Sequence, residues 1–182
     1  MGGLFSGLIT SKTRAKLLVR FFLNPGAGSY LRELAKEFNV STNSVREELN
    51  QLSRAKFLKF RKSGRQVIYQ ANLTHPLCDE LKSMVRKVIG IDKVIDSILY
   101  RLGNLQLAYL IDDYAEGKDT GIIDLLLVGK IDPYQLDDLS RKTERYINRK
   151  IRTLVLTPEE FEDFKIKLRL RPHLLLWDGN KK

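Results

Sequence analysis

The segment Ser29–Ala71, SYLRELAKEFNVSTNSVREELNQLSRAKFLKFRKSGRQVIYQA, decides the fold of the first half of the chain. Its early part has apolar residues at the i, i+3, i+4 and i+7 spacing of one helix face, from Leu31 to Phe38. Asn39-Val40 interrupts this spacing, and Ser41 or Thr42 then offers a side-chain cap for a new helix. We therefore predict two short helices separated by a tight turn.

The second of these helices is predicted to have one apolar and one polar face. At 100° per residue, Val45, Leu49 and Leu52 lie on the same side. The opposite side carries almost only hydrogen-bonding groups, on Asn43, Arg46, Glu47, Asn50 and Arg54. Such a face can simply be solvated, or it can bind a polar partner.

A basic hairpin is predicted directly after the second helix. Phe57–Lys62 and Gln66–Ala71 have the composition of strands, and Ser63-Gly64 between them is a turn signal. The turn is surrounded by cations, on Arg61, Lys62 and Arg65. Cations at a hairpin tip can protect a sheet edge from aggregation, or they can contact phosphates.

Helix, turn, helix and basic hairpin, in that order, resemble the winged helix-turn-helix of ArsR-type and related bacterial and archaeal regulators. In those proteins the second helix enters the DNA major groove and the wing touches flanking phosphates. The resemblance implies a sequence-specific DNA-binding transcriptional regulator. The residues that it implies for DNA binding are Ser41, Thr42, Asn43, Arg46, Asn50, Arg54, Arg61, Lys62 and Arg65.

The net charge is unevenly divided along the chain. The 182 residues suffice for two small domains. Residues 1–90 hold 16 Lys or Arg against 6 Asp or Glu, a net +10, whereas residues 91–182 hold 16 of each. A polyanion attracts such a basic domain and is held through counterion release. No predicted helix pairs a basic face with exposed large apolar groups, so double-stranded DNA is favoured over a membrane surface.

Composition argues against several other classes of protein. No run approaches the roughly 18 apolar residues of a membrane helix. The start, MGGLFSG, lacks the features of a signal peptide. A single cysteine, Cys78, suits a reducing cytoplasm. With His75 and His173 it supplies too few ligands for a metal site, so we expect neither metal nor cofactor.

Ser11–Leu23 is predicted to be a helix that ends at Asn24-Pro25-Gly26. Its apolar residues form two stripes, so the helix should be covered on more than one side. It could be the central helix of its own domain. It could also be the contact of a homodimer, as in the regulators that this segment resembles.

A second domain is predicted after Gly90, which gives domains 1–90 and 91–182. The helix that opens at Thr74-His75-Pro76 precedes this boundary. Beyond it we expect an α/β pattern, so the whole chain is of mixed α+β and α/β class. Its predicted parts are a helix at Ile91–Leu102, helices that begin at Asp132-Pro133 and Thr157-Pro158, and strands at Leu105–Ile111, Ile122–Val128, Ile151–Leu156 and Leu174–Leu176.

Two segments of this domain, LAYLIDDYAEGKDTGIIDLLLVGKID and INRKIRTLVLTPEEF, resemble minimal nucleotidyltransferases of the polymerase-β superfamily. The junction YQANLTHPLCDELKSMVRKVIG resembles a subgroup of winged-helix regulators in which a nucleotidyltransferase-like domain follows directly. Together the resemblances cover roughly residues 10 to 178. They imply a small α/β nucleotidyltransferase-like domain after the winged helix.

The catalytic pattern of that superfamily is incomplete in this chain. In the superfamily, Asp-x-Asp and a third carboxylate on a later strand hold magnesium, and a Gly-Ser backbone grips the nucleotide phosphates. Here Asp112-Asp113 replaces Gly-Ser, and Ile122 replaces the first carboxylate, whereas Asp124 remains. The later strand carries Arg152 and no carboxylate.

The resemblance therefore implies a degenerate nucleotidyltransferase site at Asp112, Asp113, Ile122 and Asp124, without catalytic residues or metal. The three carboxylates could instead regroup as a different metal site. The runner-up function is a nucleotidyltransferase that its winged helix positions on nucleic acid, and a third is a scaffold for protein contacts. An effector or protein partner at the second domain stays open. We expect Glu116 and Asp119 to be solvated loop charges.

Overall fold

The computed structural model describes residues 9–179. Contacts divide the chain into two compact units, Met1–Val88 and Ile89–Lys182. This division falls close to the predicted boundary after Gly90. The opening segment, for which the sequence predicts no signal peptide, lies outside the described residues.

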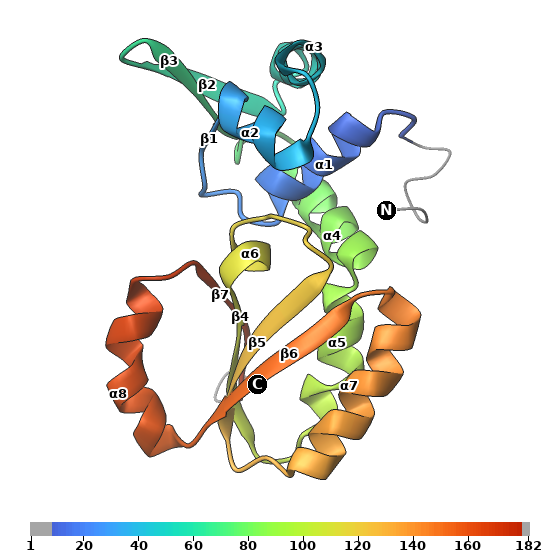
Figure 1. The fold of residues 1–182 in the computed structure, drawn as a ribbon, viewed down its shortest axis with the longest axis vertical. Coiled ribbons are helices and arrows are strands. Elements are labelled where there is room, and N and C mark those ends of the chain that lie inside the picture. Colours follow the sequence, from blue (N-terminus) through green and yellow to red (C-terminus); the bar gives the residue numbers. More distant parts are fainter. Residues whose placement is uncertain (1–8, 180–182) are drawn as a thin grey trace. The chain divides into compact units, whose positions relative to one another are not determined.

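The first unit is a winged helix-turn-helix (Figure 1). Its strands form one antiparallel sheet in the order β1-β3-β2, and the short strand β1 was not predicted from the sequence. Helix α4 follows the hairpin and reaches the boundary of the unit. The elements are α1 (Lys12–Phe22), β1 (Ser29–Tyr30), α2 (Leu31–Phe38), α3 (Thr42–Arg54), β2 (Leu58–Ser63), β3 (Gln66–Ala71) and α4 (Cys78–Ile89).

Local side-chain caps and chain reversals set the limits of these helices. The Ser11 hydroxyl accepts a hydrogen bond from Arg14 N, and the Ser41 hydroxyl accepts one from Ser44 N, both at 3.1 Å. Between α2 and α3, Asn39 adopts a left-handed conformation with φ of 53°, which asparagine tolerates better than most residues. The predicted helix-turn-helix is thereby confirmed.

Helix α1 is the centre of the first unit. Its apolar side chains are almost fully buried, and none of them is more than 8% exposed: Ala15, Leu17, Leu18, Val19, Phe21, Phe22 and the following Leu23. Of the two alternatives that the sequence leaves open for this helix, the structure supports a central helix and not a dimer contact, because both of its apolar stripes are buried within the chain. The homodimer itself stays a prediction.

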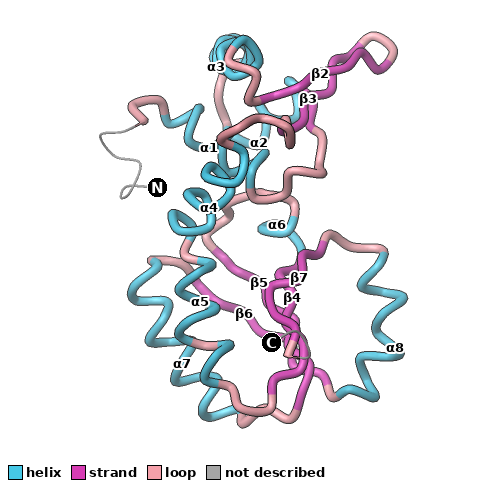
Figure 2. Tube along the Cα trace, turned by 180° about the vertical axis from the view of Figure 1, so that it is seen from behind, coloured by secondary structure: helices cyan, strands magenta, loops and turns pink. Residues whose placement is uncertain are grey.

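The second unit contains a four-stranded mixed sheet in the order β6-β5-β4-β7. Strand β4 is antiparallel to β5 and β7, and β5 is parallel to β6. Figures 1 and 2 show α8 on one side of this sheet and α5 and α7 on the other. The elements are α5 (Ile91–Ser97), the 3-10 turn η1 (Leu99–Arg101), β4 (Leu105–Ile111), α6 (Asp112–Ala115), β5 (Ile122–Gly129), α7 (Pro133–Ile147), β6 (Lys150–Leu156), α8 (Pro158–Arg169) and β7 (His173–Asp178).

Strand β5 is the core of this sheet, as its apolar run predicts. Leu126 and Val128 pack with Phe161 and Leu168 of α8. The alternate residues of β5 point to the opposite face and are also buried: Ile123, Leu125 and Leu127. The mixed α+β fold predicted from the sequence is confirmed.

The predicted single helix Ile91–Leu102 is interrupted in the structure. Helix α5 ends at Ser97, and a 3-10 turn follows. Gly90, the residue before α5, has φ of +84°. A Cβ atom there would lie 2.5 Å from the side chain of Ile147, the last residue of α7, so the close approach of α7 to this position requires glycine. Of the helices in residues 9–179, not one is both long and apolar enough to cross a membrane.

Candidate functional site

Helix α3 presents the predicted polar face to solvent. Val45, Leu49 and Leu52 are buried, as expected from the spacing. The predicted DNA-binding residues of this helix are all exposed, on its first turn or its outer face: Thr42, Asn43, Arg46, Asn50 and Arg54. Ser41 is also exposed, but its hydroxyl caps the helix. The Asn43 amide donates to Glu47 Oε1 at 2.9 Å, which holds Asn43 along the helix surface.

A polar contact from α1 fixes the rotation of α3. Arg14 of α1 forms an ion pair of 2.6 Å with Glu48 and a hydrogen bond with Gln51. Glu48 lies three residues after Val45, on the buried side of α3, and its side chain is only 12% exposed. In the sequence, this contact is indicated by a carboxylate on the apolar side of a predicted helix. Its partner, Arg14, could not be identified in the same way, because it is 34 residues away.

The basic hairpin is formed by β2 and β3. Ser63 pairs with Gln66, so the turn residues are Gly64 and Arg65, one position later than predicted. Gly64 has φ of +60°, which explains the glycine at the turn. Arg61, Lys62 and Arg65 are all exposed.

The cations of the hairpin lie on both of its faces. Arg61 and Lys62 are consecutive residues of β2, and consecutive side chains of a strand point to opposite faces. Phe60, on the same face as Lys62, is 63% exposed and lies beside Tyr69, with 6.1 Å between the ring centroids. An exposed aromatic ring near the tip was not singled out from the sequence, although strand alternation could have indicated it.

Asp124, one of the four residues of the predicted degenerate site, is paired with an arginine. It lies on β5 opposite Arg152 of the neighbouring parallel strand β6. Arg152 Nε donates to Asp124 Oδ1 at 2.6 Å, and this bond raises the pKa of Arg152. The Asp124 side chain is 10% exposed, whereas that of Arg152 is 68% exposed. The guanidinium therefore covers the retained carboxylate from the solvent side.

Asp112 is also paired with an arginine. Arg171 donates two hydrogen bonds to its carboxylate, from Nε to Oδ1 at 2.9 Å and from a terminal nitrogen to Oδ2 at 2.7 Å. Asp112 begins α6 with a left-handed φ of 58°. Asp113 beside it is half-buried.

The predicted site residues do not fit a magnesium pair. Two of the three carboxylates are neutralised by arginines, and Ile122, which is two residues from Asp124 on β5, offers no oxygen. Magnesium requires oxygen ligands in near-octahedral geometry. Within residues 9–179 no group of three or more His, Cys, Asp or Glu side chains is arranged to hold a metal ion.

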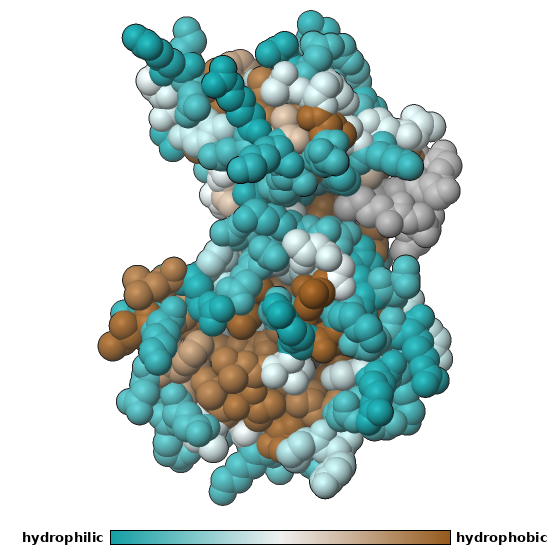
Figure 3. Space-filling model, viewed as in Figure 1, coloured by the Kyte–Doolittle hydropathy of each residue, from teal (hydrophilic) through white to brown (hydrophobic). Residues whose placement is uncertain are grey.

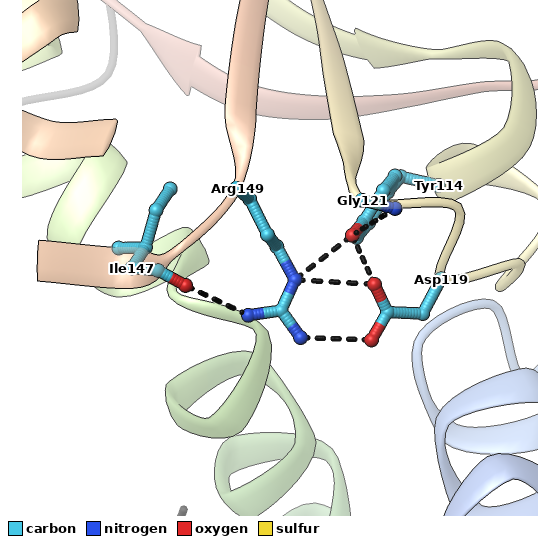
Figure 4. A network of polar contacts seen from close by, with 5 residues as sticks. All are labelled: Tyr114, Asp119, Gly121, Ile147 and Arg149. Atoms are coloured by element: carbon cyan, nitrogen blue, oxygen red, sulfur yellow. Dashed lines mark hydrogen bonds and ion pairs between the residues drawn. The ribbon is translucent and has the colours of Figure 1, made fainter. Parts of the chain in front are cut away.

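A polar network joins the loop after β4 to the start of β6 (Figure 4). Arg149 donates to both oxygens of Asp119, at 3.1 and 2.8 Å, and to Tyr114 Oη at 2.9 Å. It also donates to Ile147 O at 3.0 Å. Tyr114 donates to Asp119 and accepts from Gly121 N.

Asp119 is thus not the solvated loop charge that the sequence suggests. Its side chain is 9% exposed and that of Arg149 is 11% exposed, because Tyr114 and the chain around them exclude water. Glu116 is half-buried and forms an ion pair with Lys118. The partner of Asp119 is 30 residues away, so no local pattern predicts that pair, whereas the partner of Glu116 is two residues away in the same loop.

The network shifts the pKa values of its acids in opposite directions. Burial, and then the bond to Asp119, raises the pKa of Tyr114, so the phenol stays protonated as a donor. Burial alone would raise the pKa of Asp119, but the hydrogen bonds from Arg149 and Tyr114 outweigh it and lower the value. The group therefore contains one fixed carboxylate, one fixed cation and one neutral phenol.

Comparisons with known proteins match the fold at low sequence identity. No family model matches the chain, and no curated protein matches it. Among solved structures, reduced HlyU from Vibrio cholerae is 20% identical with a TM-score of 0.37, and the match covers 46% of this chain and 79% of that one.

Two further matches each cover about half of this chain. A chain of a toxin–antitoxin MntA–HpeT variant is 17% identical with a TM-score of 0.39, and covers 50% of this chain and 74% of its own. A Sulfolobus solfataricus protein provisionally named a nucleotidyltransferase is 20% identical with a TM-score of 0.36, covering 56% of this chain and 88% of its own.

Proposed function

We propose that the chain is a transcriptional regulator that binds double-stranded DNA in a sequence-specific manner. Helix α3 enters the major groove, and the hairpin of β2 and β3 lies on the flanking backbone. The observation that carries the proposal is the exposed row Asn43, Arg46 and Asn50 on a helix whose rotation is fixed by the Arg14–Glu48 ion pair. Arginine and asparagine side chains are suited to paired hydrogen bonds with the edges of guanine and adenine.

The charge distribution supports DNA as the partner. Residues 1–90 carry the whole net charge of +10, and residues 91–182 carry none. Attraction to phosphates supplies most of the affinity for any DNA sequence, whereas base contacts supply the discrimination. Affinity and specificity can therefore be tested with different residues.

The test of specificity is replacement of Arg46 or Asn50 by Ala. We expect each change to relax preference at one or two base pairs, by about 1–3 kcal/mol or roughly 5- to 150-fold. The measurement is selection of bound fragments from random duplex DNA, followed by titration of the selected site and its single-base variants.

Arg169→Ala is the matched control, because it removes an exposed arginine from α8 in the other unit. It should leave base preference unchanged. If Arg46→Ala and Asn50→Ala weaken binding equally for every sequence, these residues contact only the backbone, and α3 does not read bases.

The second unit, in this proposal, binds or docks without transferring nucleotides. Its strands and capped helices keep the apolar pattern of the fold. The positions that hold the metal and the nucleotide in the nucleotidyltransferases it resembles carry different residues. Arginines neutralise Asp112 and Asp124, and Ile122 places a hydrocarbon where an oxygen ligand would be needed. Arg152 takes the position next to Asp124 that a cation would otherwise occupy.

We expect no nucleotide transfer from any of the four common triphosphates, with magnesium or manganese, to protein or nucleic acid. Asp124→Asn should leave DNA binding unchanged, because asparagine can still accept a hydrogen bond from Arg152. Labelling that Asp124→Asn abolishes would instead favour the alternative, a nucleotidyltransferase positioned on nucleic acid by its winged helix. The measurement is transfer of radioactive label, with DNA titration in parallel.

A further inference from the structure

The exposed apolar surface of this chain lies mainly in the second unit. Twelve large apolar side chains are exposed in the described part of the chain, and nine of them follow Ile89. Two of these are adjacent on β6: Leu154 is 38% exposed and Val155 is 37% exposed. Figure 3 shows apolar side chains gathered over the sheet beside α8. Helix α1, in contrast, has its apolar residues buried.

Strand β6 forms one edge of the sheet, and its backbone has free hydrogen-bonding groups. Lys150 N donates to Gly121 O at 2.9 Å, so Lys150 and every second residue after it face β5. The residues between them, Ile151, Thr153 and Val155, direct their N–H and C=O groups outward. Glu144 Oε1 accepts from the outward N–H of Ile151 at 2.8 Å. The outward groups left for a partner are therefore those of Thr153 and Val155.

The opposite edge of the sheet is protected, whereas β6 is not. The pairing of β4 with β7 has a register shift between Ala108 and Tyr109, and such bulges blunt an edge. The pairing of β5 with β6 runs over seven residues without a shift, and β6 contains no proline. An unbroken, partly apolar edge strand is a template for pairing with another strand.

We propose that β6 pairs antiparallel with β6 of a second copy of this chain, about a two-fold axis at Leu154. In this register Thr153 faces Val155 of the second copy, and each pair exchanges two backbone hydrogen bonds. Leu154 lies opposite its own copy in a non-hydrogen-bonded position, where Cα atoms are about 4.5 Å apart. An axis at Thr153 fits less well, because it would require the N–H of Ile151 that Glu144 already holds.

Charge also favours antiparallel pairing of two copies. Lys150 stands at one end of β6; it pairs with Glu144 at 2.9 Å, but its side chain is 77% exposed, and Glu159 and Glu160 follow the other end. Antiparallel pairing brings the basic end of one strand towards the acidic end of the other. Residues 91–182 have no net charge, so two second units do not repel each other as two first units would. The inference deepens the proposed function, since winged-helix regulators read paired half-sites as dimers.

The test uses opposite charges on the proposed axis. Leu154→Lys and Leu154→Asp each place two like charges face to face, so each variant alone should be monomeric. An equimolar mixture should restore dimers, because lysine then faces aspartate. The measurement is molar mass by light scattering at micromolar concentration. The same two changes at Leu175, on the other edge of the sheet, should leave the wild-type dimer intact.

A cysteine at the axis gives a second readout. Leu154→Cys should form an interchain disulfide on mild oxidation, because the expected Cα separation falls within the range of disulfides. Leu175→Cys should not, and the native Cys78 is only 3% exposed. A wild-type monomer, a mixture that stays monomeric, or cross-linking at Leu175 alone would overturn the proposal.

The monomeric Leu154→Lys variant separates this inference from the proposed function. It should still prefer a single half-site over random DNA, while losing the gain in affinity from two half-sites. If dimers form as described but no variant or wild type binds DNA selectively, the strand pairing stands and the proposed function fails. If the wild type binds selectively as a monomer, the function stands and the strand pairing fails.

Discussion

Replacing Arg149 by Ala is expected to destabilise the second unit by about 3–5 kcal/mol, the cost of removing one partner from a buried ion pair. Arg149 donates to Asp119, Tyr114 and the carbonyl of Ile147, and its side chain is only 11% exposed. Within residues 9–179, its loss leaves the buried Asp119 carboxylate with the Tyr114 hydroxyl as its remaining side-chain donor. The single tryptophan, Trp177 on β7, reports unfolding of this unit by its fluorescence in urea.

The matched control is Arg141→Ala on α7. Arg141 also forms an ion pair, with Asp137, but its side chain is 71% exposed. An exposed pair of this spacing contributes only about 0.3–0.5 kcal/mol. Equal destabilisation by the two substitutions would mean that water enters the Arg149 network, and would contradict its description as buried.

The same network should limit stability at both ends of the pH range. The pKa of Asp119 is below its usual 3.8 in the folded chain, so its stabilising contribution is present above 3.8 and is lost as pH falls through the lowered value. The pKa of Tyr114 is above its usual 10.0, so its contribution is present below 10 and is lost as pH rises towards the raised value. The loss of stability at acid pH should be smaller in Arg149→Ala, because the hydrogen bonds from Arg149 help to lower the pKa of Asp119. Urea titrations at pH 3 and 7 would measure this difference.

Features set by neighbouring residues could be predicted from the sequence. The strand Leu105–Ile111 was predicted with the bounds that the structure has. The caps at Asp132 and Thr157 are present as predicted, because a cap depends on residues two or three positions away. The apolar face of α3 follows directly from helical spacing.

Features set by strand register could not be predicted from the sequence. The sequence shows Arg152 on a strand without a carboxylate, but its ion pair with Asp124 depends on the alignment of β6 with β5. Arg149 and Asp119 are 30 residues apart, and no local pattern relates them. Burial of α1 on both sides was predicted, but the sequence left open whether the second side was covered by this chain or by a second copy.

Replacing Arg61, Lys62 and Arg65 together by Ala is expected to flatten the salt dependence of DNA binding. The logarithm of the binding constant falls by about 0.9 per phosphate contacted for each tenfold rise in salt. Loss of two or three contacts should therefore reduce the slope by about 2 to 3. All three residues are exposed and Gly64 between them has no neighbour within 4 Å, so the fold should tolerate the changes.

The control removes the same charge from the second unit, through Arg141→Ala, Lys142→Ala and Lys165→Ala. These side chains are 71%, 64% and 44% exposed. The slope should stay at the wild-type value, because slope counts phosphates in contact rather than total charge. An unchanged slope in the hairpin variant would remove the wing from the DNA interface.

Single substitutions should then show how the wing lies on the backbone. Arg61 and Lys62 point to opposite faces of the hairpin, so a wing that rests on DNA with one face uses only one of them. In that case one of the two single variants, Arg61→Ala or Lys62→Ala, lowers the slope by about 0.9, and the other leaves it unchanged. The triple variant, which also removes the contact of Arg65, then lowers the slope by about 1.8. A wing whose tip enters between two phosphate rows uses both residues, and the triple variant then loses about 2.7. Slopes measured from 50 to 200 mM salt on one selected site distinguish these two arrangements.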